Sequence, residues 1–220
     1  MPNKSDDATA VTETTHFKAY LDQINSGSYP LEHDPPTAKG GGVGIAYIIG
    51  DKVVKITPDR KEAIIANALV GKTVPNLTKI HAVGELSSVG SRPSTGEAVS
   101  LYVIINDLVP DRIPGKYRIA ANAVYNYLDR HNKPIENIEQ AADEILSTAT
   151  MLPSKYRTDP DIRQGIIKVL EATDAVYKAT GILLQDPHGG NVMMRGRSIE
   201  FFDLGRSMGT PSNSQIARIT

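Results

Sequence analysis

Residues 183–194 read LLQDPHGGNVMM, and residues 201–205 read FFDLG. Asp186 and Asn191 lie five positions apart and bracket a His-Gly-Gly turn between two apolar runs, and Asp203 follows a third apolar run. This pattern predicts a strand, a polar turn, a second strand, a short turn and a third strand. Because a hairpin returns the chain to the edge where it began, we expect Asp186, Asn191 and Asp203 to lie close together.

These three side chains form a chemically specific set. Carboxylate and carboxamide oxygens are ligands that Mg²⁺ prefers, so two of these side chains could hold the ion. Beside them, a carboxylate could orient a hydroxyl, and phosphoryl transfer uses this combination. The alternative interpretation is three surface polar residues on a hairpin.

The composition excludes several other classes of protein. The 24 basic and 25 acidic residues give no basic field for nucleic acid. No apolar run approaches the ~20 residues that span a bilayer, and residues 1–13 lack the apolar core of a signal peptide. With no cysteine, the chain has no disulfide or thiolate metal site. We therefore expect a cytoplasmic protein with neither nucleic-acid nor membrane partners.

A glycine-rich stretch marks the first half of the chain. Glycines at the entry to a hairpin let backbone N–H groups approach phosphate oxygens. The turn at Gly50 and Asp51 joins two β-branched runs, and the second run contains Lys55, a cation in an otherwise apolar strand. The candidate phosphate-contacting residues of the stretch are Gly40, Gly41, Gly42, Val43 and Gly44.

The elements that follow divide into a β-rich and a helical half. Residues 59–70 predict a helix with Ile64 on its apolar side, and residues 79–85 and 98–105 predict two further strands. From residue 114 onward the apolar spacing becomes helical, with three helices up to a C-cap at Gly181.

The order of these features resembles the protein kinase-like superfamily. The Asp186–Asn191 spacing followed by Asp203-Leu204-Gly205 is similar to its catalytic loop and metal-binding Asp-Phe-Gly. The local form Asp-x-His-x-Gly-Asn resembles aminoglycoside and choline kinases and compact kinases of tailed bacteriophages. The resemblance implies an α+β, two-lobe kinase-like fold with an antiparallel N-lobe sheet and a reduced helical C-lobe.

The resemblance also implies the cofactors ATP and Mg²⁺ and assigns roles to further residues. Lys55 would neutralise phosphate charge, and Glu62, the only glutamate of the helix that follows, would pair with Lys55. By the same resemblance, Asp186 would accept or orient the hydroxyl proton, and Asn191 and Asp203 would be the metal ligands. The implied catalytic set is Asp186, Lys55 and Glu62. The hinge, whose backbone groups would contact adenine, is Asn106, Asp107 and Leu108.

The expected organisation has four parts. Residues 1–15 are expected to be disordered, residues 16–106 to form the N-terminal lobe, and residues 107–205 to form the helical lobe with the catalytic hairpin. Residues 206–220 are expected to be a tail whose Ser and Thr residues, from Ser207 onward, undergo self-phosphorylation.

The predicted function is transfer of the ATP γ-phosphoryl group to a Ser/Thr hydroxyl of a protein. Gln185 stands where typical protein kinases have arginine, and the sequence ends fifteen residues after Gly205. These departures favour a compact phage-type kinase, acting on host proteins in the host cytoplasm, over aminoglycoside and choline kinases with their large helical C-terminal regions. A small-molecule kinase, a pseudokinase that binds a host protein, and nucleotidyl transfer stay as alternatives.

Overall fold

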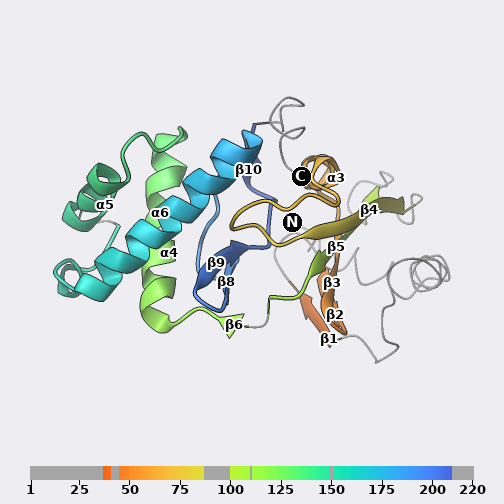
Figure 1. Cartoon of the computed structure of the whole chain (residues 1–220), viewed down its shortest axis with the longest axis horizontal. Coiled ribbons are helices and arrows are strands. Elements are labelled where there is room, and N and C mark those ends of the chain that lie inside the picture. The colour runs from red at the N-terminus through yellow and green to blue at the C-terminus, as the bar shows by residue number, and fades with distance from the viewer. Residues whose placement is uncertain (1–36, 41–44, 87–99, 110, 149–150, 210–220) are drawn as a thin grey trace, which may run out of the picture. The chain divides into compact units, whose positions relative to one another are not determined.

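The computed structural model describes residues 37–40, 45–86, 100–109, 111–148 and 151–209 of the chain (Figure 1). These residues divide into two compact units. The first unit ends at Gly71 and resumes over Lys79–Leu108, and the second comprises Lys72–Thr78 and the residues from Val109 onward. Of the described helices, none combines the length and the apolar character that crossing a bilayer requires.

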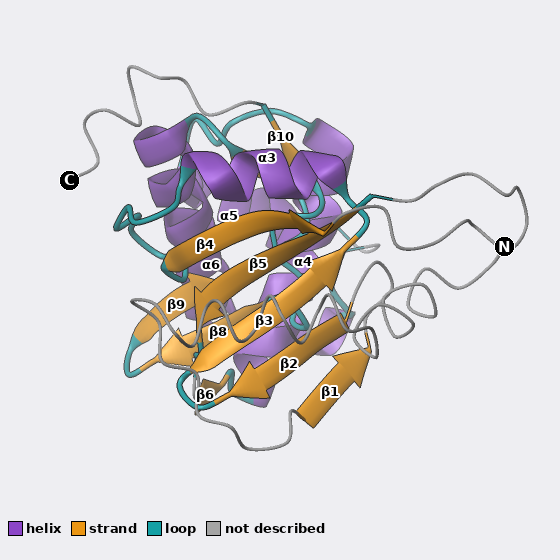
Figure 2. Cartoon of the chain, turned by 90° about the vertical axis from the view of Figure 1, so that its right-hand side faces the viewer, coloured by secondary structure: helices purple, strands orange, loops and turns teal. Residues whose placement is uncertain are grey.

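The first unit is built on an antiparallel sheet of five strands in the order β1-β2-β3-β5-β4 (Figure 2). The predicted hairpin is present, because Ile49 pairs with Lys52 across a two-residue turn whose Gly50 has φ +57°. Glycine adopts this left-handed conformation without strain. The strands are β1 Thr37–Gly40, β2 Ile45–Ile49, β3 Lys52–Thr57, β4 Ile80–Leu86 and β5 Leu101–Asp107.

Helix α3, Arg60–Ala68, packs on β4 and β5 in the same unit (Figure 2). The Asp59 side chain caps it by accepting hydrogen bonds from two first-turn N–H groups. Ile65 is buried, whereas Ile64 is 52% exposed. The expectation that Ile64 faces the core is therefore wrong, because the helix turns its Glu62, Ala63, Ile65 and Ala66 inward.

Three helices form the bulk of the second unit: α4 Gly115–His131, α5 Ile138–Ser147 and α6 Pro160–Thr180. Helix α6 packs against both others, and the short 3₁₀ helix η1, Ser154–Tyr156, precedes it (Figure 1). A Cβ at Gly165 of α6 would lie 2.9 Å from the Cβ of Ala120 of α4, so the helices cross closely there. Helix α6 ends at Gly181 with φ +76°, as predicted.

Small sheets follow the helices in the second unit. Strand β7, Leu183–Leu184, pairs with β10, Ser207–Met208, and β8, Val192–Arg195, lies between β6, Asp111–Arg112, and β9, Ser198–Phe201. The predicted hairpin between the strands flanking residues 185–191 is therefore wrong. Strand β8 already has a neighbour on each side, so residues 185–191 form a loop that leads from one small sheet to another.

The connector Lys72–Thr78 belongs to the second unit through strand β9. Phe201 N–H donates to Asn76 O at 2.9 Å, Thr78 N–H donates to Phe201 O at 2.9 Å, and the Asn76 amide donates to Ile199 O at 2.8 Å. These bonds pin the backbone immediately before Asp203.

The α+β class, with an antiparallel sheet in one unit and a small helical second unit, is confirmed. The predictions for residues 1–15, for Gly41 to Gly44 and for residues 210–220 lie outside the described residues. Ser207 is described, and its expected role as a phosphate acceptor is wrong because it is 2% exposed and paired in β10.

Candidate active site

The loop at residues 185–191 is closed by its own hydrogen bonds. The Asn191 side-chain amide donates to the backbone carbonyl of Asp186 at 3.1 Å, and the Asn191 N–H donates to His188 O at 2.8 Å. Phe202 N–H donates to Asn191 O at 3.5 Å, which places the residue before Asp203 against the end of the loop. The second unit therefore brings Asp186, Asn191 and Asp203 together, as the sequence predicts, through the loop and not through a hairpin.

Asp186 occupies a partly buried position within this group. Burial raises the pKa of its carboxyl above the usual value, while the positive charges of His188 and Arg206 oppose the rise and the negative charge of Asp203 adds to it. A carboxylate with a raised pKa is a stronger proton acceptor when ionised. The electrostatics of the loop are thus those of a candidate general base.

His188 fixes the conformation of the loop beside Asp186. Its Nδ1 accepts a hydrogen bond from Gly190 N–H at 2.9 Å, so in the neutral ring the proton lies on Nε2. Nε2 is 3.7 Å from the Asp186 Oδ1, beyond hydrogen-bond distance but close enough for an electrostatic contact. His188 therefore makes a hydrogen bond within the loop.

The two glycines of the loop leave no room for a side chain. A Cβ at Gly189 would lie 2.2 Å from Arg118 Cγ and 3.2 Å from Arg118 Cα, and one at Gly190 would lie 2.6 Å from the His188 ring. The Gly-Gly pair is thus required by close approach to helix α4 and to the histidine.

Asn191 and Asp203 are the candidate metal ligands. One Asp203 oxygen accepts a hydrogen bond from Gly205 N–H at 2.9 Å, which fixes the start of the Asp-Leu-Gly turn. Because the Asn191 amide nitrogen points at Asp186 O, its oxygen points to the opposite side of the amide group. Among the described residues, no three or more Asp, Glu or His side chains form a complete cation cage. The donor set fits Mg²⁺, which takes one or two protein oxygens and completes its shell with water and substrate phosphates.

Lys55 and Glu62 meet within the first unit. The Lys55 Nζ lies 2.6 Å from Glu62 Oε1, and the two side chains are 14% and 2% exposed. Glu62 occupies the third position of α3, where a glutamate commonly bonds the capping residue's own N–H. Here the Thr57 hydroxyl takes the Asp59 N–H at 3.1 Å, which leaves Glu62 available to Lys55. The predicted pair is made despite its separation of only seven residues.

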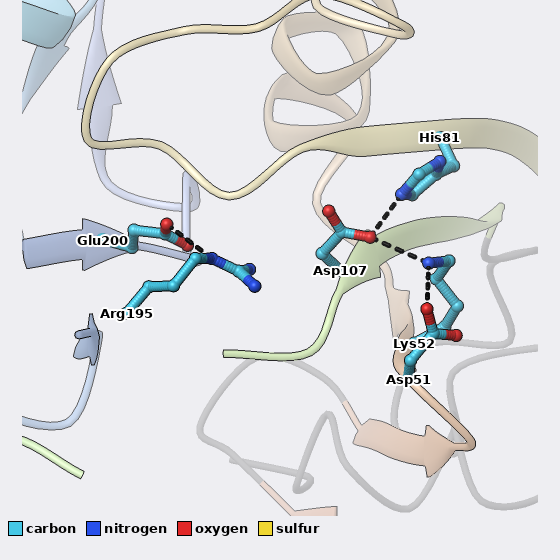
Figure 3. Close-up of polar contacts among 6 residues, drawn as sticks. All are labelled: Asp51, Lys52, His81, Asp107, Arg195 and Glu200. Atoms are coloured by element: carbon cyan, nitrogen blue, oxygen red, sulfur yellow. Dashed lines mark hydrogen bonds and ion pairs between the residues drawn. The ribbon is translucent and has the colours of Figure 1, made fainter. Parts of the chain in front are cut away.

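Asp107, the central residue of the predicted hinge, has a structural role through its side chain. Asp107 accepts hydrogen bonds from Lys52 at 2.9 Å and from His81 at 2.6 Å, and Lys52 also contacts Asp51 at 2.8 Å (Figure 3). Burial acts to raise the pKa of Asp107, but the bonds from Lys52 and His81 prevail and lower it. The cluster fixes the end of β5.

The hinge backbone is also partly engaged. Asp107 N–H donates to Lys79 O at 3.0 Å, and Leu108 N–H donates to Asp51 O at 2.8 Å. A base contact at these two residues would therefore have to use carbonyl oxygens. The adenine contact at Asn106, Asp107 and Leu108 stays a prediction. At Asp107 and Leu108 it is restricted to the backbone carbonyl oxygens.

Sequence reasoning missed the residues of α4 that support the catalytic loop. Asn122 accepts the Gly189 N–H at 2.9 Å, and Arg206, just after the Asp-Leu-Gly turn, binds Tyr125 and Asp129 of the same helix. A signal was present, since the three α4 residues recur at helical spacing on the polar face of an otherwise alanine-rich helix.

Comparison with known proteins gives only distant likenesses. No protein-family model and no curated protein matches the chain. One similar solved structure is a choline/ethanolamine kinase family protein from Mesorhizobium loti, at 16% identity and a TM-score of 0.35, covering 88% of this chain and 66% of that one. Another is wild-type aminoglycoside 2'-phosphotransferase-IIIa in its GDP complex, at 15% identity and a TM-score of 0.39, covering 90% and 75%.

The chain thus spans less than two thirds of the first of these proteins. At these identities and TM-scores neither likeness carries an argument about function. The function proposed below rests on the chain's own residues.

Proposed function

We propose that this chain is an ATP-dependent phosphotransferase whose acceptor is a Ser or Thr hydroxyl of a protein. The observation that carries the proposal is the closed loop of the second unit. It holds a carboxylate of raised pKa, Asp186, beside two oxygen donors suited to a hard cation, Asn191 and Asp203.

Each residue has one role in this proposal. Asp186 orients the acceptor hydroxyl and takes its proton as the oxygen attacks the γ-phosphorus, while the bond from that phosphorus to the bridging oxygen breaks and ADP leaves. Asn191 and Asp203 hold Mg²⁺, which when bound neutralises charge on the transferred phosphate. In the first unit, Glu62 orients Lys55, whose ammonium group neutralises charge on the nucleotide phosphates.

The pairing of Lys55 supports this reading of the first unit. A strand lysine with no function commonly extends its amine into water, at little cost. Here the amine is bound to a carboxylate that is 2% exposed, and desolvating both charges is expensive for stability alone. The pair with Glu62 holds the Lys55 ammonium group in a defined position, and a phosphate-binding site requires such a position.

The proposal of a protein acceptor is supported by the sequence resemblance of residues 186–205 to compact protein kinases. The second candidate is a kinase for a small molecule, which the Asp-x-His-x-Gly-Asn form of residues 186–191 favours. A pseudokinase is the third, and it differs by transferring no phosphate at all.

Labelled ATP distinguishes the candidates. The protein is incubated with γ-labelled or α-labelled ATP and Mg²⁺, with a protein extract or with a panel of aminoglycosides and choline. We expect γ label on Ser or Thr of protein, absent with the Asp186→Asn variant. Label only on small molecules would establish the second candidate, label from the α position would establish nucleotidyl transfer, and no label in any arm would refute the proposal.

A further inference from the structure

Helix α4 carries a polar stripe that lies against the catalytic loop. Its members are spaced four, three and four residues apart, which places them along one side of a helix. The opposite side of α4 is core, with Ala120, Ala123, Val124 and Leu128 at most 1% exposed. The stripe consists of Arg118, Asn122, Tyr125 and Asp129.

The first part of the stripe contacts the loop directly. Asn122 accepts the Gly189 N–H at 2.9 Å, and the stem of Arg118 lies where a Gly189 side chain would be. The Tyr125 ring meets the His188 ring edge-on, with centroids 6.0 Å apart. The loop that holds Asp186 is thus supported along its length by one helix.

The second part of the stripe binds Arg206. Its Nη1 donates to the Tyr125 hydroxyl at 2.8 Å, its Nη2 donates to Asp129 Oδ1 at 3.2 Å, and the guanidinium lies 5.8 Å from the Tyr125 ring centre. The Arg206 carbonyl also accepts the Gln185 N–H at 3.0 Å. One residue therefore joins α4, the residue before Asp186, and the Asp203-Leu204-Gly205 turn.

Stability alone is a poor reason for this arrangement. The Arg206 and Asp129 side chains are 55% and 49% exposed, and ion pairs this exposed contribute little to folding. The contacts instead join α4 to the segment that follows Asp203, beside the β7–β10 pairing, which reaches neither Asp186 nor Asp203.

We propose that Arg206 is a positioning residue for the phosphotransfer: by binding Tyr125 and Asp129, it holds the turn that carries Asp203 in register with the loop that carries Asp186. The inference rests on the proposed function.

The variants are Arg206→Gln, Arg206→Lys and Tyr125→Phe, with Arg163→Gln as the matched control. Arg163 is likewise a surface arginine of the second unit with two carboxylate partners, Glu139 at 2.6 Å and Asp143 at 3.0 Å, but it joins α6 to α5. Each protein is measured for kcat, KM for ATP, Tm, and the hydrogen exchange of the amides of residues 185–191.

For Arg206→Gln we expect kcat to fall by about tenfold to a hundredfold, because small displacements of catalytic groups are costly. The KM for ATP should be nearly unchanged, Tm should fall by less than about 4 °C, and exchange at Gln185 and Gly189 should become faster. Arg206→Lys should recover part of kcat. Tyr125→Phe should have little further effect in the Arg206→Gln background, since the bond it removes is already lost.

Two failures are distinguishable. If wild-type protein transfers phosphate and Arg206→Gln matches it in kcat and in loop exchange, or if Arg163→Gln loses as much kcat, the positioning role is refuted and the proposed function stands. If wild-type protein transfers no phosphate, the proposed function fails and the catalytic role of Arg206 fails with it.

Discussion

Lys55 and Glu62 illustrate how single residues of the first unit are matched to their surroundings. Both are largely withdrawn from water, and each charge offsets the cost of burying the other. The Thr57 hydroxyl makes this possible by taking the hydrogen bond at Asp59 that Glu62 would otherwise satisfy. The Thr57 hydroxyl therefore leaves the Glu62 carboxylate available to bind Lys55.

Replacing Lys55 with Met removes this charge at similar side-chain length. We expect the free energy of unfolding at pH 7 to fall by about 3 kcal/mol, because one member of a buried pair is lost, and phosphate transfer to fall strongly. The double variant Lys55→Met/Glu62→Met should regain stability without activity. Denaturant unfolding and transfer assays separate the two effects, and a single variant as stable as wild type would contradict the buried-pair account.

Asp107 gives a pH-dependent prediction in the same unit. Its folded-state pKa is lowered by Lys52 and His81 against the effect of burial, so its contribution to stability is present above the usual pKa of 3.8 and is lost as pH falls through the lowered value. Asp107→Asn should cost about 1–3 kcal/mol at pH 7, and the difference from wild type should shrink in acid.

Asp51→Asn is the control for this change. Asp51 also contacts Lys52, but its side chain is 81% exposed, so the cost should stay below about 0.5 kcal/mol. Equal losses for Asp51→Asn and Asp107→Asn across the pH range would contradict the assignment of the hinge cluster.

At the scale of elements, the catalytic loop depends on the helix behind it. Gly189 and Gly190 leave space for α4 and for His188, and Asn122 receives the loop's N–H. Besides the hydrogen bonds within the loop, α4 contacts it on one side and the Phe202 backbone contacts it on the other.

Gly189→Ala tests this dependence. The new Cβ would lie 3.2 Å from the Arg118 backbone, so the loop must shift and phosphate transfer should fall by about tenfold or more. Gly115→Ala is the control, because a Cβ there meets nothing within 4 Å and it begins a helix, where alanine is tolerated. Wild-type kinetics for Gly189→Ala would show that the close approach does not matter.

Much of the element pattern could be predicted from sequence, because it depends on local chemistry. The three helices of the second unit followed from apolar spacing and from the cap at Gly181. The β2–β3 hairpin followed from Gly50 and Asp51. The pairing of β7 with β10 could not be predicted, since two-residue strands carry no register signal. Ile64 was misplaced because Ile65 beside it is equally apolar, so apolar spacing alone does not show which of the two faces the core.

The residues of the candidate site likewise divide into those that could be predicted from the sequence and those that could not. Asp186, Asn191 and Asp203 are identifiable because their spacing is set by a single loop and turn. The contributions of Asn122, Tyr125 and Arg206 depend on which helix packs behind that loop. Such contacts arise from tertiary packing and leave only a weak periodicity in the sequence.

At the scale of the whole molecule, two compact units contribute different parts of the predicted chemistry. The first unit supplies a paired lysine, and the second supplies the candidate base and metal ligands. A nucleotide that binds only the folded chain should raise Tm.

Mg²⁺ with a non-hydrolysable ATP analogue tests this expectation. At a hundredfold excess over Kd the folded state should gain about 2.7 kcal/mol. Asp203→Asn should shift the Mg²⁺ dependence of this gain to higher concentration, since it removes the only carboxylate assigned to the cation. A Tm rise that is independent of Mg²⁺, or identical in Asp203→Asn, would remove Asp203 from the site.

The most direct test of the central claim is the steady-state kinetics of Asp186→Asn with γ-labelled ATP. The carboxylate is assigned to the acceptor hydroxyl and not to the nucleotide, so kcat should fall by about a hundredfold or more while the KM for ATP stays nearly unchanged. A variant with wild-type kcat, or one that loses only ATP affinity, would contradict the role assigned to Asp186 and with it the proposed phosphotransfer site.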